Sequence, residues 1–204
     1  MKSNENVKVQ RSKQNFKNAY IELIALKGYS QVTVSNIVEQ AGYNRSSYYK
    51  YFDGKEAITA EIMDEFMEGF IAVAKKNSNS RISQLEDATN HTIELFEHIK
   101  NNKTYFKLLT FEDTLPHIQD KFISVIVNIL DKEIVFLTGD NDENHNDYLN
   151  SFRAFGTYGF ILTWIKNDFD ISPSQAAKHL INFYIKSYTS VMHVKYHEEP
   201  YSEI

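Results

Sequence analysis

The segment from Asn44 to Lys55 concentrates side chains that can donate hydrogen bonds, and Asp53 is its only acidic residue. Amide, hydroxyl, ammonium and guanidinium groups donate to phosphate oxygens and to the acceptor atoms on base edges. The donors are Asn44, Arg45, Ser46, Ser47, Tyr49, Lys50, Tyr51 and Lys55. The chemistry that this segment favours is contact with a nucleic acid.

The charge of the chain is divided unevenly. The 204 residues together have a formal net charge of −5, yet residues 1–60 hold nine basic and five acidic side chains, a net charge of +4. The remaining residues carry a net charge of −9. A basic amino-terminal part on an acidic remainder is typical of a protein that meets a polyanion at one end.

Other chemistries each lack a necessary residue. Residues 140–151 begin like a calcium loop but have neither its central Gly nor its final Glu. Ser47 and Lys50 match a Ser-x-x-Lys nucleophile without the partner motifs of that class. His193 and His197 have zinc-protease spacing without the required Glu. We therefore expect no enzyme activity, no metal site and no cofactor.

The residues before the donor segment predict two helices. Residues 11–27 place apolar side chains at helical spacing, and Gly28 can end that helix with a positive φ angle. Thr33 is a suitable N-cap for a short helix through Ala41, after which Gly42 interrupts the chain.

The donor segment itself begins with another capping residue. Asn44 can cap a third helix over residues 45–51, and a fourth runs from Gly54 or Lys55 to about Lys76. Two short helices joined by a turn with glycine have the size of a helix-turn-helix, which presents the polar start of its second helix to the major groove.

The rest of the chain also predicts helices. Their approximate ranges are 82–100, 104–111, from Pro116 to 137, 148–166 and 174–196, with a loop over 139–147. The chain has only seven Gly and three Pro, and no stretch alternates like a strand. The fold is therefore predicted to be all-α, with about nine helices.

Composition indicates the compartment. The absence of Cys excludes a disulfide framework, and no apolar run approaches the ~18 residues of a membrane-spanning helix. Residues 1–14 are polar and unlike a secretory signal. We expect a soluble, cytoplasmic protein.

Several elements resemble the DNA-binding domain of the TetR family of bacterial transcriptional regulators. They are Gly28-Tyr29, Val32-Thr33-Val34 and the unbroken stretch from Ala41 to Glu56. The Ala-Gly, Tyr-x-x-Phe and Lys-Glu pairs within that stretch have the family spacing. The resemblance covers about residues 9–69.

The resemblance implies roles for individual residues. Thr33 would bond a phosphate, Asn44 would cap the recognition helix and touch the DNA backbone, and Arg45 and Ser46 would face base edges. The residues implied to contact phosphate are Tyr49, Tyr51 and Lys55. Lys50 could contact either phosphate or bases. Ile37, Ala41 and Phe52 would be core residues.

The chain departs from the family pattern at four positions. Tyr43 replaces a small aliphatic residue, Asn44 a serine, Tyr48 a leucine or phenylalanine, and Tyr51 a common histidine. Tyr51 leaves a phosphate contact open. Tyr43 and Tyr48 bear on local packing, and we do not expect either to be a contact.

The acidic remainder is rich in aromatic residues at helical spacing. Such residues are usually core, and their excess leaves room for a pocket lined by Phe66, Phe70, Phe96, Tyr105, Phe106, Phe111 or Trp164. The resemblance implies a small apolar or aromatic effector there, and a homodimer formed by the last two long helices. Candidate dimer contacts are Phe152, Phe155, Gly159, Leu162, Phe183, Tyr184 and Tyr188, with Gly156 and Gly159 permitting close approach.

These observations favour a DNA-binding domain over residues 1–54 and a regulatory and dimerisation domain over residues 55–204. The leading hypothesis is a repressor that an effector releases from a palindromic operator. A second hypothesis is a repressor or activator controlled by a partner protein, with the pocket filled by side chains. A third is an all-α enzyme or an interaction module that binds no DNA.

Overall fold

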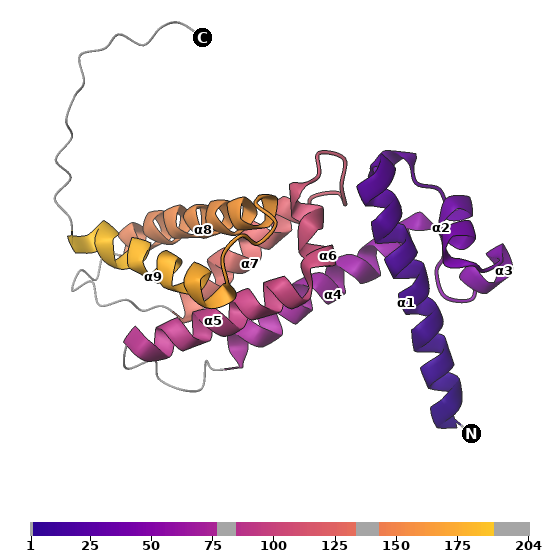
Figure 1. Ribbon diagram of the computed structural model, residues 1–204, viewed down its shortest axis with the longest axis horizontal. Helices are drawn as coiled ribbons and strands as arrows, with labels where there is room; N and C mark the ends of the chain where they lie inside the picture. The colour runs from indigo at the N-terminus through magenta and orange to yellow at the C-terminus, as the bar shows by residue number, and fades with distance from the viewer. Residues whose placement is uncertain (1, 77–84, 134–142, 190–204) are drawn as a thin grey trace, which may run out of the picture.

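The computed structural model of the protein describes residues 2–76, 85–133 and 143–189. Within these ranges the chain forms nine α-helices, two 3-10 helices and no strand, which confirms the predicted all-α fold. In order (Figure 1) they are α1 (Lys2–Lys27), η1 (Tyr29–Gln31), α2 (Val34–Ala41), α3 (Arg45–Tyr48), α4 (Lys55–Lys75), α5 (Leu85–Asn101), α6 (Lys103–Phe106), η2 (Lys107–Thr110), α7 (Ile118–Glu133), α8 (Glu143–Lys166) and α9 (Pro173–Thr189).

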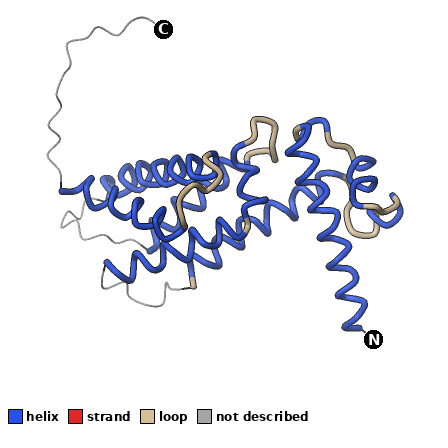
Figure 2. Tube along the Cα trace, viewed as in Figure 1, coloured by secondary structure: helices blue, strands red, loops and turns tan. Residues whose placement is uncertain are grey.

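Helix α4 links two parts of the molecule (Figures 1 and 2). The first part, called here the tripod, is α1 to α3 and sits at the amino-terminal end of α4. The second, called the body, contains α5 to α9. In it α5 packs on α9, α7 packs on α8, and α4 reaches in against α5 and α7. None of the described helices has the length and apolar character needed to cross a membrane.

Aromatic rings mark the core of each part. In the tripod, the Phe16 ring lies edge-on to Tyr48, with centroids 5.2 Å apart, and Phe52 completes the group. In the body, Phe66 lies 4.8 Å from Phe106 and contacts Phe122. Because large rings exclude water from both places, each part is held by burial of apolar surface.

An ionic group joins α1 to α4. Lys17 is almost completely buried, and its Nζ lies 2.8 Å from Glu61 and 2.5 Å from Glu65. Burial alone would lower the pKa of Lys17, but hydrogen bonds to the two carboxylates outweigh it and raise that pKa. Lys13 also pairs with Glu61, at 2.5 Å. The buried ammonium is therefore retained in its charged form.

Two helices begin earlier in the sequence than predicted. Helix α1 starts at Lys2 instead of Arg11, because residues 2–10 contain no Gly or Pro to stop it. The predicted loop over 139–147 is wrong from Glu143, where α8 has begun. An acidic residue in the first turn favours a helix there, since it complements the positive end of the helix dipole.

Other boundaries fall short of the prediction. The third helix ends at Tyr48 instead of residue 51, because the chain turns there to bury Phe52. The helix predicted over 104–111 is the short α6 followed by η2, with Phe111 extended. Residues 82–84, 134–137 and 190–196 of other predicted helices lie outside the described residues.

Candidate nucleic-acid interface

Helix α2 begins with the cap that the sequence predicted. The Thr33 hydroxyl oxygen accepts from the Asn36 backbone N–H at 3.3 Å, while Asn36 Oδ1 accepts from the Thr33 N–H at 3.1 Å and from its hydroxyl at 2.8 Å. This reciprocal capping box fixes the start of α2. Lys27 Nζ also donates to Asn36 Oδ1, at 2.7 Å, which brings a cation beside the cap.

The turn between α2 and α3 depends on Gly42. Its φ of 72° and ψ of 31° are left-handed, and its N–H donates to the Glu39 carbonyl. The Tyr43 N–H then returns to the Val38 carbonyl at 2.9 Å. A glycine takes this conformation without the penalty that a Cβ would add. The turn directs the next helix away from α2, as a helix-turn-helix requires.

Helix α3 presents its first residues to solvent. Asn44 Oδ1 accepts from the Ser47 N–H and from the Ser46 hydroxyl, both at 2.8 Å, which confirms Asn44 as the N-cap. Asn44, Arg45 and Ser46 are all exposed. The Arg45 guanidinium donates to the hydroxyl of Ser35 on α2. The two helices thus bring a guanidinium and three small polar side chains to one surface.

Opposite this surface, Tyr48 is completely buried. Its ring packs against Phe16 and Phe52, and its hydroxyl donates to the Gly54 carbonyl at 2.9 Å. Burial raises the pKa of Tyr48, so the hydroxyl stays protonated and able to donate. The tyrosine in place of the usual aliphatic or phenyl residue therefore anchors α3 to the start of α4.

Tyr43 also has a structural role. Its ring lies 4.8 Å from Phe16, and its hydroxyl accepts from the Asn15 side-chain amide at 3.1 Å. Hydrogen bonds from Ser12 and Asn15 lower the pKa of Tyr43. The residue thus connects α1 to the turn before α3.

The turn after α3 carries three predicted contacts. Tyr49 is 56% exposed and Lys50 is exposed, so both are accessible to a phosphate. Tyr51 is half-buried, with its ring 6.4 Å from Phe16. Seven of the eight predicted contact residues therefore lie on or near α2, α3 and the turn that follows.

Lys55 lies at the start of α4 and turns inward. Its Nζ donates to the Tyr29 carbonyl at 3.1 Å and lies 4.2 Å from the centre of the Tyr29 ring. An ammonium has three hydrogens, so two remain for another acceptor. Sequence reasoning missed this contact, and it also missed Lys27 and Ser35, because these pairings are between separate helices and leave no local spacing signal.

The predicted pocket residues separate into two buried groups and a half-buried pair. Phe66, Phe70 and Phe106 are buried together against Phe122. Phe96 packs on Trp164, with ring centroids 5.1 Å apart. Tyr105 and Phe111 are half-buried at the edge of the core.

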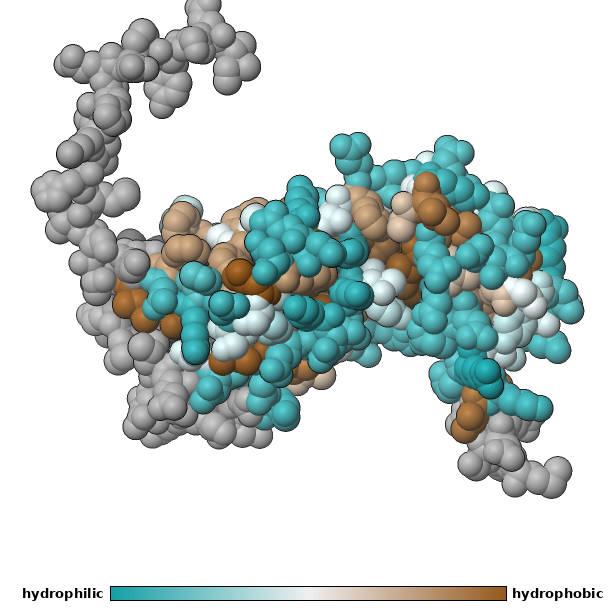
Figure 3. Space-filling view, in the orientation of Figure 1, coloured by the Kyte–Doolittle hydropathy of each residue, from teal (hydrophilic) through white to brown (hydrophobic). Residues whose placement is uncertain are grey.

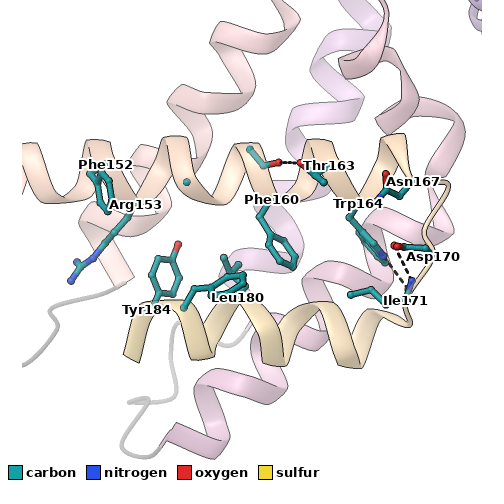
Figure 4. A pocket seen from close by; sticks show the side chains of 13 residues that line it. Phe152, Arg153, Phe160, Thr163, Trp164, Asn167, Asp170, Ile171, Leu180 and Tyr184 are labelled. Carbon is teal, nitrogen blue, oxygen red and sulfur yellow. Dashed lines mark hydrogen bonds between the residues drawn. The ribbon is translucent and has the colours of Figure 1, made fainter. Parts of the chain in front are cut away.

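A groove of about 490 Å³ lies between α8 and α9 (Figure 4). Trp164 lines it, and its indole N–H donates to the Ile171 carbonyl at 3.0 Å. Other groove residues come from the predicted dimer contacts, namely Phe152, Gly159, Phe183 and Tyr184. The groove therefore coincides with the face that the sequence assigned to dimerisation.

That face is markedly apolar. Phe152 is 72% exposed, Phe155 60% and Phe183 55%. Leu162 and Tyr184 are half-buried, and the side chain of Tyr188 lies outside the described residues. Apolar residues (brown) reach the surface over the α8 and α9 end in Figure 3, whereas the tripod end is mostly hydrophilic. Among the described residues, no cluster of His, Asp or Glu has the arrangement of a metal site.

Two family models match the chain. The model described as "Bacterial regulatory proteins, tetR family" matches residues 18–62, and the model "Transcriptional regulator C-terminal region" matches residues 86–186. The first contains the helix-turn-helix, and the second contains most of the body.

Known proteins are similar to the chain over most of its length. The fatty acid metabolism regulator protein of Bacillus subtilis is 25% identical over 163 residues, which are 74% of this chain and 81% of that protein. The dhaKLM operon transcriptional activator DhaS of Lactococcus lactis is 25% identical over 135 residues, 66% of each chain.

A solved structure shows the same fold. The transcriptional regulator FadR of Bacillus subtilis, in complex with stearoyl-CoA, superposes with a TM-score of 0.61 at 22% identity, over 83% of this chain and 96% of that one. The helix-turn-helix geometry, the two family models and this fold agree. The chain belongs to the TetR family of bacterial transcriptional regulators, which bind DNA and are not enzymes.

Proposed function

We propose that the protein is a cytoplasmic, homodimeric repressor that binds a palindromic operator through residues 1–54 and is released when residues 55–204 bind a small effector. The observation that carries the DNA-binding half is the capped start of α3, exposed on one side and held from the other by buried Tyr48. A helix fixed in this way can place its first side chains in a major groove.

Within this proposal, the candidate DNA-contact residues divide by chemistry. Arg45 and Ser46 read base edges, because they lie on the exposed first turn of α3. The residues that contact phosphate or backbone are Thr33, Asn44, Tyr49, Lys50, Tyr51 and Lys55, and Lys50 is also placed to reach a base. Lys27 and Ser35 join them, because they lie beside Asn36 and Arg45 respectively.

A dimer accounts for the exposed face of the body. Phe152, Phe155 and Phe183 are large apolar residues that leave water when a second copy covers them. A Cβ added at Gly156 or Gly159 would meet open space within the described chain, so a partner helix could approach closely there. Two-fold pairing presents two α3 helices to half-sites one or more helical turns apart, which a palindrome provides.

The effector half of the proposal rests on the body's aromatic content and on the relatives. Phe66 and Phe70 lie on α4, pack with Phe106 in an apolar core, and share that helix with Lys55. The Bacillus subtilis relative has been solved with stearoyl-CoA. A long-chain acyl thioester is therefore the first effector to test.

A second candidate is regulation by a partner protein without a small ligand. The observation that favours it is packing: Phe66, Phe70 and Phe106 are each at most 4% exposed and contact one another or Phe122 directly. A region filled by side chains has no space for a ligand until it rearranges. One relative is named a transcriptional activator, so activation is the alternative sign of regulation to test.

The DNA-binding half is tested by fluorescence anisotropy with a duplex selected from a random library by the purified protein. We expect Lys55→Ala to weaken selected and random duplexes alike and to reduce the salt slope by about 1. Arg45→Ala should also reduce the preference for the selected duplex, by roughly 1–3 kcal/mol for each base that the guanidinium reads. Lys166→Ala, an exposed body lysine, is the charge control. Equal losses on both duplexes for Arg45 and Lys55 variants would contradict the assigned roles.

The effector half is tested with stearoyl-CoA, using coenzyme A alone as the control. The proposal expects stearoyl-CoA to raise the melting temperature and to weaken binding to the selected duplex. If neither stearoyl-CoA nor a panel of other apolar metabolites changes duplex affinity, control by a partner protein becomes the better account.

A further inference from the structure

The loop of residues 111–117 reaches from the body to the tripod. The Asp113 carboxylate accepts from the Ser30 N–H at 3.1 and 3.0 Å, one distance to each oxygen, and from the Ser30 hydroxyl at 2.6 Å. The Asp113 carbonyl accepts from the Tyr29 N–H at 3.0 Å. One residue thus holds the backbone of η1 through both its main chain and its side chain, and bonds to a charged acceptor are stronger than neutral ones.

Gly28 makes this contact possible. Its φ is +82°, a value that L-residues with side chains rarely adopt. A Cβ at this position would also fall inside the Asp113 carboxylate. The glycine that ends α1 therefore serves two purposes, because it turns the chain and leaves space for an acidic residue from the body.

On the tripod side, the contact leads to residues of the proposed DNA surface. The Tyr29 N–H donates to Asp113. The carbonyl of the same residue accepts a hydrogen bond from the Lys55 ammonium, which also lies over the Tyr29 ring. Ser30 lies three residues before Thr33, the cap of α2. A displacement of Asp113 would therefore move both the Lys55 side chain and the start of α2.

On the body side, the loop is firmly attached. The Thr114 hydroxyl in the loop donates to the Leu108 carbonyl at 2.8 Å. Just after the loop, the Gln119 amide on α7 donates to the Leu109 carbonyl at 3.0 Å. Leu108 and Leu109 are completely buried in η2, the 3-10 helix that follows α6 and its buried Phe106. A change in the aromatic core would reach Asp113 through these short connections.

We propose that Asp113 is a positioning residue that sets the orientation of the tripod on the body and couples the aromatic core to the DNA surface. It forms a second link besides α4. This inference rests on the proposed function for its DNA readout, whereas its structural part can be tested without DNA. Coupling between two sites requires such an element, whose arrangement both sites can bias.

The first experiment is amide hydrogen exchange on the free full-length protein. Because the Ser30 N–H donates to the Asp113 carboxylate, Asp113→Ala should speed exchange at Ser30 by roughly tenfold or more. The Tyr29 N–H should keep its protection better, because it donates to the Asp113 main-chain carbonyl, which alanine retains. Glu112→Gln, on the exposed neighbouring residue, is the control and should change neither. Unchanged protection of Ser30 in Asp113→Ala would overturn the proposal at its structural level.

The second experiment measures coupling with the duplex selected from a random library. In the wild type, we expect the duplex to change the exchange rates of amides in residues 111–117. In Asp113→Ala the duplex should still bind, but the rates in that loop should no longer respond. A response of the same size in the variant would show that the coupling does not run through Asp113 and would refute the proposal.

A conservative variant separates positioning from a general loss of structure. Asp113→Asn keeps one carbonyl oxygen to accept from Ser30, so it should recover part of the amide protection and part of the loop response. If Asp113→Ala and Asp113→Asn both lower the melting temperature and abolish duplex binding equally, Asp113 is only structural and the proposal is wrong. If the wild type binds no duplex but Ser30 loses protection in Asp113→Ala, the proposed function fails and the structural link stands.

Discussion

The tripod and the body differ in where their polar and apolar groups find partners. In the tripod, the polar side chains that shape the backbone form hydrogen bonds with nearby backbone groups. They are the caps Thr33 and Asn44 and the hydroxyl of Tyr48. In the body, large apolar side chains such as Phe152 and Phe155 remain open to solvent. The polar groups that shape the tripod have their partners inside it, so its surface is suited to a polar ligand. The body instead exposes an apolar face, which is suited to burial against another apolar surface.

This difference separates two kinds of aromatic residue. Adjacent tyrosines in the tripod point to opposite sides, with Tyr48 buried and Tyr49 exposed. In the body, Phe160 is half-buried and lies 6.0 Å from the exposed ring of Phe183. An exposed ring with a hydroxyl suits a phosphate contact, whereas exposed phenyl rings suit association with a second subunit.

The largest expected effect tests the packing of the tripod core. Tyr48→Ala removes a fully buried ring and should lower the free energy of unfolding by roughly 3–5 kcal/mol. Tyr48→Phe loses only the hydrogen bond to Gly54 and should cost about 1 kcal/mol. Chemical denaturation measures both.

Tyr49→Ala is the matched control for this test. Its ring is exposed and touches Tyr48 edge-on at 5.6 Å, so the change should cost about 1 kcal/mol or less. It should nevertheless weaken DNA binding. Comparable destabilisation by the two alanine variants would remove the distinction between an inner and an outer tyrosine.

The next effect tests the open face of the body. Phe155→Asp places a charge where the proposed dimer buries a ring, so the protein should sediment as a monomer. Affinity for a palindromic duplex should fall by roughly tenfold to hundredfold, about 1.4–2.7 kcal/mol, because one monomer engages one half-site. Val7→Asp, on the exposed part of α1, should leave the oligomeric state unchanged. A dimeric Phe155→Asp would place the interface elsewhere.

Two glycines sharpen the comparison at a smaller scale. Gly42→Ala should destabilise the protein by about 1–2 kcal/mol, since its φ of +72° is left-handed although no atom would be touched. Gly156→Ala lies in α8, where alanine is the better helix former, so the isolated subunit should gain up to about 1 kcal/mol. The same variant should weaken the dimer, as measured by sedimentation at several concentrations. Stabilisation by both variants would be inconsistent with a strained turn at Gly42.

The smallest expected effect concerns the stability of the folded protein at acidic pH. Burial alone would raise the pKa of Glu61, but hydrogen bonds from Lys13 and Lys17 outweigh it and lower that pKa below its usual value. A carboxyl group with a lowered folded-state pKa stabilises the protein fully above its unfolded value and loses that contribution as pH falls through the folded value. The urea midpoint should therefore fall more between about pH 6 and pH 3 in the wild type than in Glu61→Gln. Glu68→Gln, exposed on the same helix, should behave like the wild type.

The tripod was predicted well because its signals are local. Thr33, Gly42 and Asn44 each act on backbone within three or four residues, so residue type and spacing were enough to place the caps and the turn. The third helix was predicted too long, because its end depends on Phe52 reaching Phe16 across the core. The predicted directions of contact with DNA are still predictions.

The sequence by itself determined the all-α class, the helix-turn-helix and the apolar stripes, because backbone preference and side-chain periodicity are properties of neighbouring residues. Only the tertiary structure decided that Lys55 turns to Tyr29, that Asp113 holds Ser30, and that the groove lies between α8 and α9. Those contacts join residues from separate elements, up to 83 positions apart, and depend on how whole helices pack. The local spacing of residue types therefore carries no signal for contacts between residues so far apart in the sequence.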